Sequence, residues 1–222
     1  MIRLPSPVLA GLPAGVVDTW CVPLHPESAA LARWRTTLSH DERAQAARMR
    51  VTGAAWAAAR GALRTILGYY LAETPESLRF GASPLGKPRL SGRAAPHFSV
   101  AWREDLALVG VASDREVGVD LEREREDADV SAIARDFLSP LEQAAIAQAP
   151  SERRRTVFFE AWARHEARRK LHGLGLEDPL PAVESGSVVI VRALNVPEGW
   201  TAAVAAEGGA WRVRRRDVDE LR

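Results

Sequence analysis

The chain of 222 residues contains a single cysteine, Cys21, and this scarcity excludes two kinds of site. A disulfide within the chain is impossible, and so is a metal site built from several cysteines. Such low cysteine usage is typical of proteins of the reducing cytoplasm. Residues 1–15 lack a basic segment followed by an uninterrupted apolar core, so they do not predict a signal peptide. We therefore expect a cytoplasmic protein.

Long apolar runs and an excess of charge of one sign are also missing. No apolar stretch approaches the roughly 18 residues that a membrane span requires, and the formal net charge at pH 7 is +1. Binding to nucleic acid or to an anionic membrane would therefore need a local basic patch, and we expect neither partner. Hydrophobic residues make up 46% and charged residues 27% of the chain, which is typical of a globular protein with a buried core.

Hydrophobic periodicity predicts strands and helices in alternation. Period-2 patterns predict strands at residues 15–22, 97–102, 106–113, 115–122, 185–194, 199–208 and 210–218. A period near 3.6 predicts helices at residues 39–50, 54–71, 129–138, 139–149 and 157–172. The pair Asp114-Arg115 predicts a hairpin turn between two consecutive strands. This order predicts an α+β protein with an N-terminal α+β half at 1–112 and a C-terminal α+β half at 113–222.

The stretch 157–176, VFFEAWARHEARRKLHGLGL, has an unusual helical face. At 3.6 residues per turn, one face collects Phe158, Phe159, Trp162, Glu166 and Lys170. A face directed at the core would carry only apolar side chains, so the two charged residues need an explanation. One reading is a solvated ion pair at i,i+4 beside an aromatic ridge. The other is a functional site.

A second acidic pair, Asp120 and Glu122, lies at strand spacing in the sequence VGVDLE. Side chains alternate along a strand, so both carboxylates project from the same face. Two like charges side by side are destabilising unless a partner neutralises them. Mg²⁺ fits, because it binds a few carboxylates together with phosphate oxygens, and Glu166 is a candidate third ligand. The alternative is that the pair faces solvent at a strand end.

Four motifs occur in a characteristic order: GKPRL at 86–90, VGVDLE at 117–122, FLSPLE at 137–142 and FFEAWARHEARRKLHGLGL at 158–176. Together they resemble the Sfp-type 4'-phosphopantetheinyl transferases over about residues 38–209. The resemblance implies a pseudo-twofold pair of α/β halves with coenzyme A bound between them. It also implies transfer of the phosphopantetheine arm from coenzyme A to a serine of an acyl or peptidyl carrier protein, in a Mg²⁺-dependent reaction that releases adenosine 3',5'-bisphosphate.

The same resemblance implies roles for individual residues. Three acids would hold Mg²⁺ on the pyrophosphate: Asp120, Glu122 and Glu166. Glu166 would also help to deprotonate the acceptor serine, and Lys170 would contact the phosphates and stabilise the leaving group. Lys87 and Pro88 would border the adenine.

The chain departs from the family pattern at the 3'-phosphate of coenzyme A. Trp102, beside Arg103, takes the place of a histidine that contacts this phosphate, and His165 replaces a lysine in the long-helix motif. Positions that are typically basic or hydroxyl-bearing hold Glu42, Gln45, Trp56, Ala57 and Ala58. Nearby cations that could substitute include Arg48, Arg60 and Arg103, while Trp102 could stack on a base.

Three functions agree with this sequence. The protein is a transferase that holds the 3'-phosphate with other arginines, a repurposed family member that uses a different ligand or donor, or a non-catalytic binder of carrier proteins. We expect a monomer. The sequence does not distinguish primary lipid metabolism from secondary metabolism, and it does not identify the carrier protein.

Overall fold

The computed structural model describes residues 11–24, 29–91, 96–175, 178 and 188–221. In chain order its elements are β1 (Val16–Pro23), α1 (Ala29–Thr36), α2 (His40–Arg48), α3 (Gly53–Leu71), η1 (Pro75–Ser77), β2 (Phe80–Ala82), β3 (Pro88–Leu90), β4 (His97–Arg103), β5 (Leu106–Ala112), β6 (Val117–Arg123), α4 (Val130–Phe137), α5 (Pro140–Gln148), α6 (Arg154–His172), β7 (Val189–Ala193), β8 (Trp200–Glu207), β9 (Arg212–Arg216) and η2 (Val218–Leu221). These elements confirm the α+β class. Leu176 and the start of the strand expected at 185–194 lie outside the described residues.

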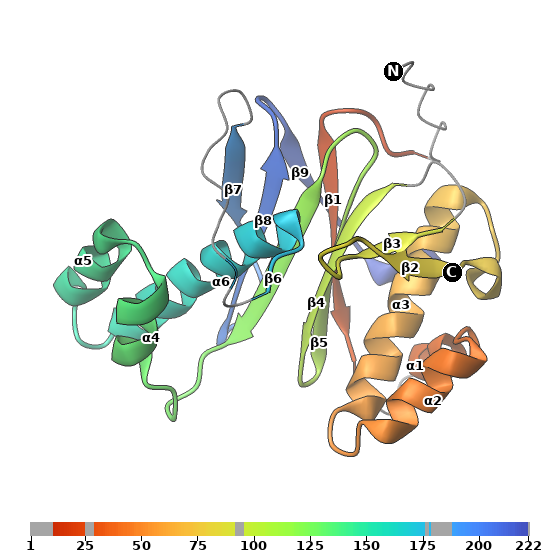
Figure 1. Cartoon of the computed structure of the whole chain (residues 1–222), viewed down its shortest axis with the longest axis horizontal. Helices are drawn as coiled ribbons and strands as arrows, with labels where there is room; N and C mark the ends of the chain where they lie inside the picture. Colours follow the sequence, from red (N-terminus) through yellow and green to blue (C-terminus); the bar gives the residue numbers. More distant parts are fainter. Residues whose placement is uncertain (1–10, 25–28, 92–95, 176–177, 179–187, 222) are drawn as a thin grey trace.

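Two sheets stand side by side at the centre, with helices on the outer side of each (Figure 1). The larger sheet has the strand order β4-β5-β1-β9 and the smaller one the order β6-β8-β7, while β2 and β3 form a separate short hairpin. Strand β9 runs parallel to β1, although all other pairings in the described part of the chain are antiparallel. Residues after 112 therefore contribute one strand to a sheet that is otherwise built from residues before 113.

Strands β5 and β6 do not form the hairpin expected at Asp114-Arg115, so that prediction is wrong. β5 pairs with β1 and β4, whereas β6 pairs with β8 in the other sheet. Every residue of β5 is buried, because its alternate side chains pack against α3 on one face and against the smaller sheet on the other. The turn instead carries the chain from one sheet to the other. The Gly15 N–H donates a hydrogen bond of 3.0 Å to the Asp114 carboxylate and holds this turn against the start of β1.

Alternation along β1 separates two apolar layers. Trp20 points toward α3 and packs with Leu63 and Leu67, while Val17 points the other way and packs with Val119 of the second sheet. Because β1 is buried on both faces, its sequence is apolar over most of its length. The inter-sheet layer joins the two sheets into a single body.

Helix α6 covers the outer face of the smaller sheet and is positioned by small residues. Ala163 and Ala167 pack against Ala203 and Ala205 of β8. The approach is closest at Gly118 of β6, where an added Cβ would lie 2.1 Å from the Ala167 carbonyl oxygen. The spacing between β6 and α6 therefore depends on the absence of a side chain at this position.

We expect Gly118→Ala to lower the free energy of unfolding by about 1–3 kcal/mol, because the methyl group must displace the backbone of α6. Urea denaturation monitored by circular dichroism measures this change. Gly209→Ala is the matched control, since an added Cβ there meets no atom within 4 Å. Equal stability of the two variants would show that α6 can move away from β6 without cost.

A buried ionic network fixes β9 to β1. Asp18 is fully buried and accepts hydrogen bonds from the Tyr70 hydroxyl of α3 and from the guanidinium groups of Arg214 and Arg216. The indole N–H of Trp20 donates to the Tyr70 hydroxyl at 3.0 Å. Burial and the hydrogen bond to Asp18 raise the pKa of Tyr70, so this hydroxyl stays protonated as a donor. One carboxylate thus connects three elements.

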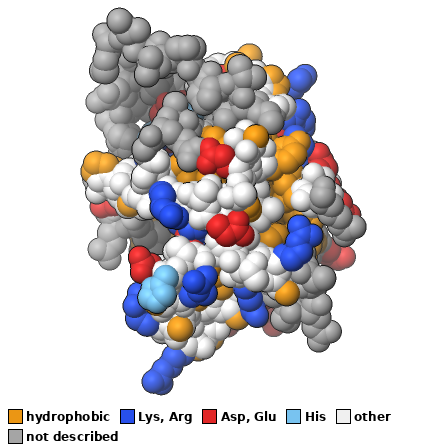
Figure 2. All heavy atoms as spheres, turned by 90° about the vertical axis from the view of Figure 1, so that its right-hand side faces the viewer, with side chains coloured by type: hydrophobic (Ala, Val, Ile, Leu, Met, Phe, Trp, Pro, Cys, Tyr) orange, Lys and Arg blue, Asp and Glu red, His pale blue; other side chains and the backbone are white. Residues whose placement is uncertain are grey.

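On the side formed by α1 to α3, the described residues carry charges of both signs (Figure 2). In Figure 2, Lys and Arg side chains are interspersed with Asp and Glu on this face. Within the described residues, none of the helices has the length and apolar character needed to cross a membrane.

Candidate functional site

The two acids of β6 are buried rather than solvated. Asp120 is 3% exposed and Glu122 is 6% exposed, which excludes the reading in which this pair faces solvent at a strand end. Both project toward α6, where the Lys170 ammonium lies 2.6 Å from Asp120 Oδ1. Lys170 therefore pairs with Asp120, and the solvated i,i+4 pair between Glu166 and Lys170 is wrong.

Glu166 of α6 completes an acidic cluster with Asp120 and Glu122. Burial and the negative charge of Asp120 raise the pKa of Glu122, and burial with the charges of Asp120 and Glu122 raises the pKa of Glu166. The three carboxylates are thus close enough to repel one another. Arg103 of β4 offsets part of this repulsion, since its Nε lies 2.9 Å from Glu122 Oε2.

Two carboxylate oxygens of this acidic cluster have no hydrogen-bond partner. Asp120 Oδ2 and Glu166 Oε1 are both buried and unpaired, and the nearest cation to Glu166, Arg169 Nε, lies 3.7 Å away. Orphaned carboxylate oxygens in a cluster of three acids suit a hard cation such as Mg²⁺. Among the described residues, no group of three or more His, Cys, Asp or Glu side chains is arranged so that it could hold a metal ion. A Mg²⁺ ion at this cluster would therefore need phosphate oxygens of a substrate and water to complete its shell.

Cavities open on both sides of the acidic cluster. One, of about 280 Å³, is lined by Lys170 together with Pro88 and Val100. A second, of about 490 Å³, shares Pro88 and Val100 with the first and extends to Trp102 and Arg60. These two cavities form one cleft between the β2–β3 hairpin and β4. A third, of about 260 Å³, lies on the other side and is lined by Arg103, Glu122, Glu166 and apolar side chains of α4 and α6.

Lys87 lies at the cleft, but its ammonium group is already saturated. It donates to Glu116 at 2.7 Å, to the Val117 carbonyl at 2.8 Å and to the Leu171 carbonyl at 2.9 Å. These bonds tie the turn before β3 to the start of β6 and the end of α6. Only the stem of Lys87 and the ring of Pro88 are left to face a ligand.

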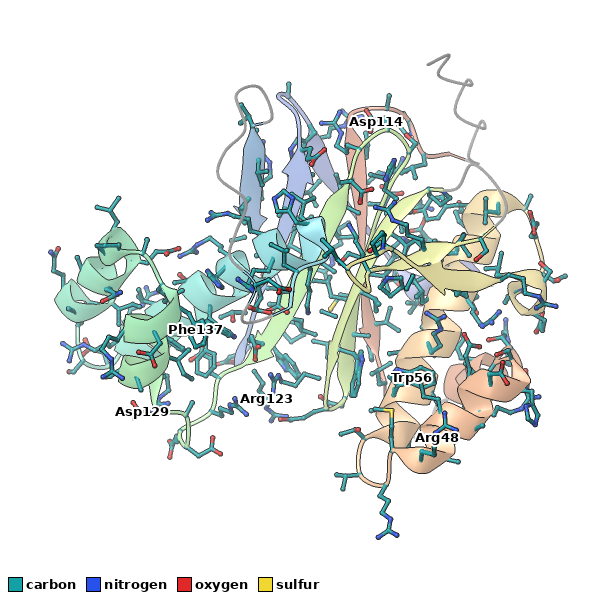
Figure 3. All side chains as sticks on the ribbon, viewed as in Figure 1. Arg48, Trp56, Asp114, Arg123, Asp129 and Phe137 are labelled. Atoms are coloured by element: carbon teal, nitrogen blue, oxygen red, sulfur yellow. The ribbon has the colours of Figure 1, made fainter. Side chains whose placement is uncertain are left out.

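The residues expected near the 3'-phosphate are largely engaged with one another. Arg60 donates to Glu42 at 2.6 Å and lies 3.7 Å above the Phe80 ring, so it is committed to two partners. Trp102 lines the 490 Å³ cavity with Trp56 and Gln45. Ala57 is buried in the core. Arg48 is exposed at the end of α2, on the side of the molecule opposite Phe137 (Figure 3).

His165 points away from the cleft. Its ring stacks on Trp162 with centroids 5.5 Å apart, and it lines none of the three cavities. Burial and the nearby Arg169 lower the pKa of His165, so the ring is neutral at pH 7. A neutral, buried imidazole is a poor substitute for the cationic lysine of the family motif.

The sequence did not reveal the partners of two acids that organise this region. Glu116 accepts hydrogen bonds from Lys87, Arg89 and His97, and although burial opposes ionisation, these bonds hold the pKa of Glu116 far below its usual range. Glu42 similarly holds Arg60 and Arg64. No spacing signal marks these partners, because they come from elements far apart in the sequence.

The comparisons with known proteins all point to one family. The model of the 4'-phosphopantetheinyl transferase superfamily matches residues 116–191, a segment that contains the whole acidic cluster and Lys170. The chain is 32% identical to the 4'-phosphopantetheinyl transferase HetI of Nostoc sp., over 94% of each chain. It is also 32% identical to a putative 4'-phosphopantetheinyl transferase of Synechocystis sp., over 56% of this chain and 51% of that protein. A further relative, the L-aminoadipate-semialdehyde dehydrogenase-phosphopantetheinyl transferase of Eremothecium gossypii, is 32% identical over 64% of this chain and 54% of its own length.

Proposed function

Because the chain belongs to the 4'-phosphopantetheinyl transferase superfamily, we propose that it transfers the 4'-phosphopantetheine arm of coenzyme A to a serine of an acyl or peptidyl carrier protein, with Mg²⁺ as cofactor. The observation that carries the proposal is the buried acidic cluster with Lys170 at its edge. Asp120 and Glu122 are only 3–6% exposed, and both lie close enough to Glu166 for the three carboxylates to repel one another. Such a buried cluster lowers the stability of the fold, and a cation-dependent reaction gives a reason for it.

Phosphoryl transfer mainly requires positioning and charge neutralisation. Asp120, Glu122 and Glu166 would hold Mg²⁺, which supplies positive charge to the pyrophosphate oxygens of coenzyme A. Lys170 is partly exposed and lines the cleft, so its ammonium, which pairs with Asp120, would also contact a phosphate oxygen of coenzyme A. There it stabilises the charge that develops on the leaving group.

Glu166 is the group that we propose removes the serine proton. It faces the 260 Å³ cavity on the side away from the cleft, which leaves room for the acceptor serine. The serine oxygen bonds to the phosphorus that carries the pantetheine arm, its proton passes to Glu166, and the bond to the bridging oxygen breaks. Adenosine 3',5'-bisphosphate leaves through the cleft lined by Pro88.

Binding of the 3'-phosphate is expected to contribute little to affinity. Of the residues that line the 490 Å³ cavity, Arg60 is the cation, and it is already paired with Glu42; Arg103 is likewise paired with Glu122. We therefore expect coenzyme A and 3'-dephospho-coenzyme A to bind with dissociation constants within about tenfold of each other, since each lost charge-assisted bond is worth about 1.5–3 kcal/mol. Calorimetry with Mg²⁺ measures both constants. A preference for coenzyme A of several hundredfold would show that other cations hold the phosphate.

The proposed reaction is tested by intact-protein mass spectrometry. Purified protein is mixed with coenzyme A, Mg²⁺ and apo forms of an acyl and a peptidyl carrier protein, with a chelator in a parallel sample. A mass gain of one phosphopantetheine arm that the chelator abolishes supports the proposal. Binding of a carrier protein without a mass gain would favour a non-catalytic binder. Neither binding nor transfer would favour a repurposed enzyme with a different donor.

A further inference from the structure

A second groove opens where the edges of the two sheets diverge. Strand β9 is an edge of the larger sheet and β7 an edge of the smaller one, and the space between them holds a cavity of about 700 Å³. Its lining shares no residue with the three cavities around the acidic cluster. The groove is therefore a separate place on the molecule, and its volume is within the range of small-molecule sites.

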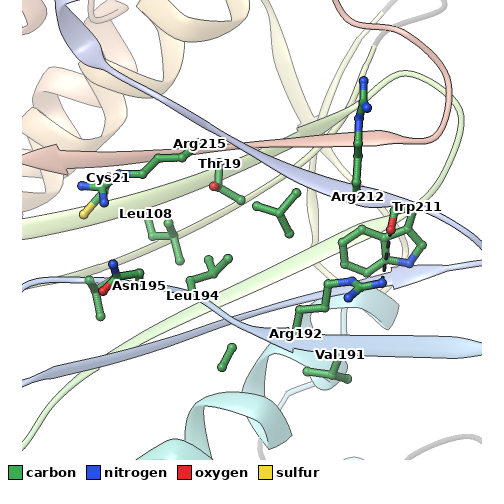
Figure 4. A pocket seen from close by; sticks show the side chains of 13 residues that line it. Thr19, Cys21, Leu108, Val191, Arg192, Leu194, Asn195, Trp211, Arg212 and Arg215 are labelled. Atoms are coloured by element: carbon green, nitrogen blue, oxygen red, sulfur yellow. Dashed lines mark hydrogen bonds between the residues drawn. The ribbon is translucent and has the colours of Figure 1, made fainter.

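The floor and walls of this groove are apolar. Leu108 of β5 and Val213 of β9 form one wall, Val191 of β7 and Leu194 form the other, and Trp211 closes one end. In Figure 4, Leu108 and Leu194 lie between the two ends of the groove. These side chains belong to the inter-sheet core or pack against it, so the floor is rigid. An apolar ligand body would remain in contact with them along its whole length.

The rim of the groove carries positive charge that is not balanced. Arg192, Arg212 and Arg215 line it, and its lining contains no Asp or Glu. Arg192 donates to the Trp211 carbonyl at 3.2 Å and lies over the Trp211 ring, so it serves to close that end. Across the described residues, neither Arg212 nor Arg215 forms an ion pair, whereas Arg214 and Arg216 of the same strand both pair with Asp18, and Arg216 also pairs with Glu220.

The two ends of the groove differ in their polar groups. Figure 4 shows Cys21, Arg215 and Asn195 toward one end of the groove, and Trp211 with Arg192 toward the other. The first end thus holds a guanidinium that has no acidic partner among the described residues and an amide, while the opposite end is closed by an indole. Because guanidinium and amide donors suit carboxylate and phosphate oxygens, the Arg215 end is the anionic subsite.

We propose that this groove binds an amphipathic organic anion, with its carboxylate or phosphate group at Arg215 and its apolar body along Leu108 and Val213 toward Trp211. The site does not depend on the acidic cluster or on the transfer reaction. An apolar body alone would gain burial but leave the Arg215 guanidinium unpaired, and a small anion alone would leave the floor unfilled.

The test uses probes that differ only in the head group: decanoate, decyl phosphate and decanol, each below its aggregation limit. Calorimetry is performed on the full chain saturated with coenzyme A and Mg²⁺, so that the reaction cleft is occupied. We expect decanoate or decyl phosphate to bind at least tenfold more tightly than decanol, and the comparison of the two anions shows which head group the site prefers. Equal binding of all three probes, or binding of none, would overturn the proposal.

Variants then locate the site. Arg215→Ala should weaken binding of the preferred anion at least tenfold, and Arg215→Lys should restore part of it. Arg35→Ala, an exposed arginine of α1 outside the groove, is the matched control and should bind as the unmodified protein does. Ala193→Trp places a large ring on the exposed rim at β7 and should abolish binding even if the arginine variants are unstable. Unchanged binding in both Arg215→Ala and Ala193→Trp would place the ligand elsewhere.

Discussion

Glu166→Gln is expected to lower the rate of phosphopantetheine transfer by about 10²–10⁴-fold, because an amide can neither accept the serine proton nor hold a cation as a carboxylate does. The variant keeps the size and shape of the side chain, so α6 is expected to remain folded. The measurement is the initial rate of mass gain on the apo carrier protein that the unmodified enzyme modifies best.

The same substitution should not reduce stability. Burial and the charges of Asp120 and Glu122 raise the pKa of Glu166, which means that its ionised form is disfavoured in the folded protein. Because the folded protein disfavours a negative charge at this position, a neutral amide relieves the repulsion, so the free energy of unfolding without Mg²⁺ should stay equal or rise. Glu160→Gln, on the same helix, is the matched control and should change neither quantity. A variant that loses activity together with its fold would contradict the assigned role.

Asp18→Ala is expected to lower the free energy of unfolding by about 3–5 kcal/mol, the usual effect of removing one partner from a buried ion pair. The change leaves the Tyr70 hydroxyl and the guanidinium groups of Arg214 and Arg216 without their shared acceptor. Urea denaturation followed by tryptophan fluorescence measures the loss, since Trp20 packs beside Tyr70. The control is Asp136→Ala, because Asp136 is exposed and pairs with the adjacent Arg135. A difference of less than about 0.5 kcal/mol between the two variants would mean that the network contributes no net stability.

Periodicity predicted most of the secondary structure correctly, because each signal is local. Ser39 and Ser139 begin their helices by capping the backbone N–H groups of Glu42 and Glu142, as their position before a helical pattern indicates. Strand pairing was not predictable in the same way. The hairpin at Asp114-Arg115 was expected from proximity in sequence, but the choice of partner strand depends on which apolar faces meet in the folded protein.

The candidate site was predictable only where its signal is local in the sequence. Two-residue spacing on β6 placed Asp120 and Glu122 together, and their burial followed only from the packing of α6 on β6. The partners of these acids were not predictable. Lys170 turned to Asp120 rather than to Glu166, and Arg103 to Glu122, because the nearest opposite charge belongs to another element. Spacing gives the face on which a side chain lies, but not the group it meets there.

The pairing of β9 with β1 has a consequence for synthesis on the ribosome. The guanidinium of Arg214 meets the carboxylate of Asp18 across 196 positions of sequence, so the first strand cannot complete its pairing until residue 216 has left the exit tunnel. Until then β1 presents an open edge and an unpaired buried acid, and the larger sheet cannot reach its native stability during translation. The larger sheet is therefore completed only after residue 216 has been made.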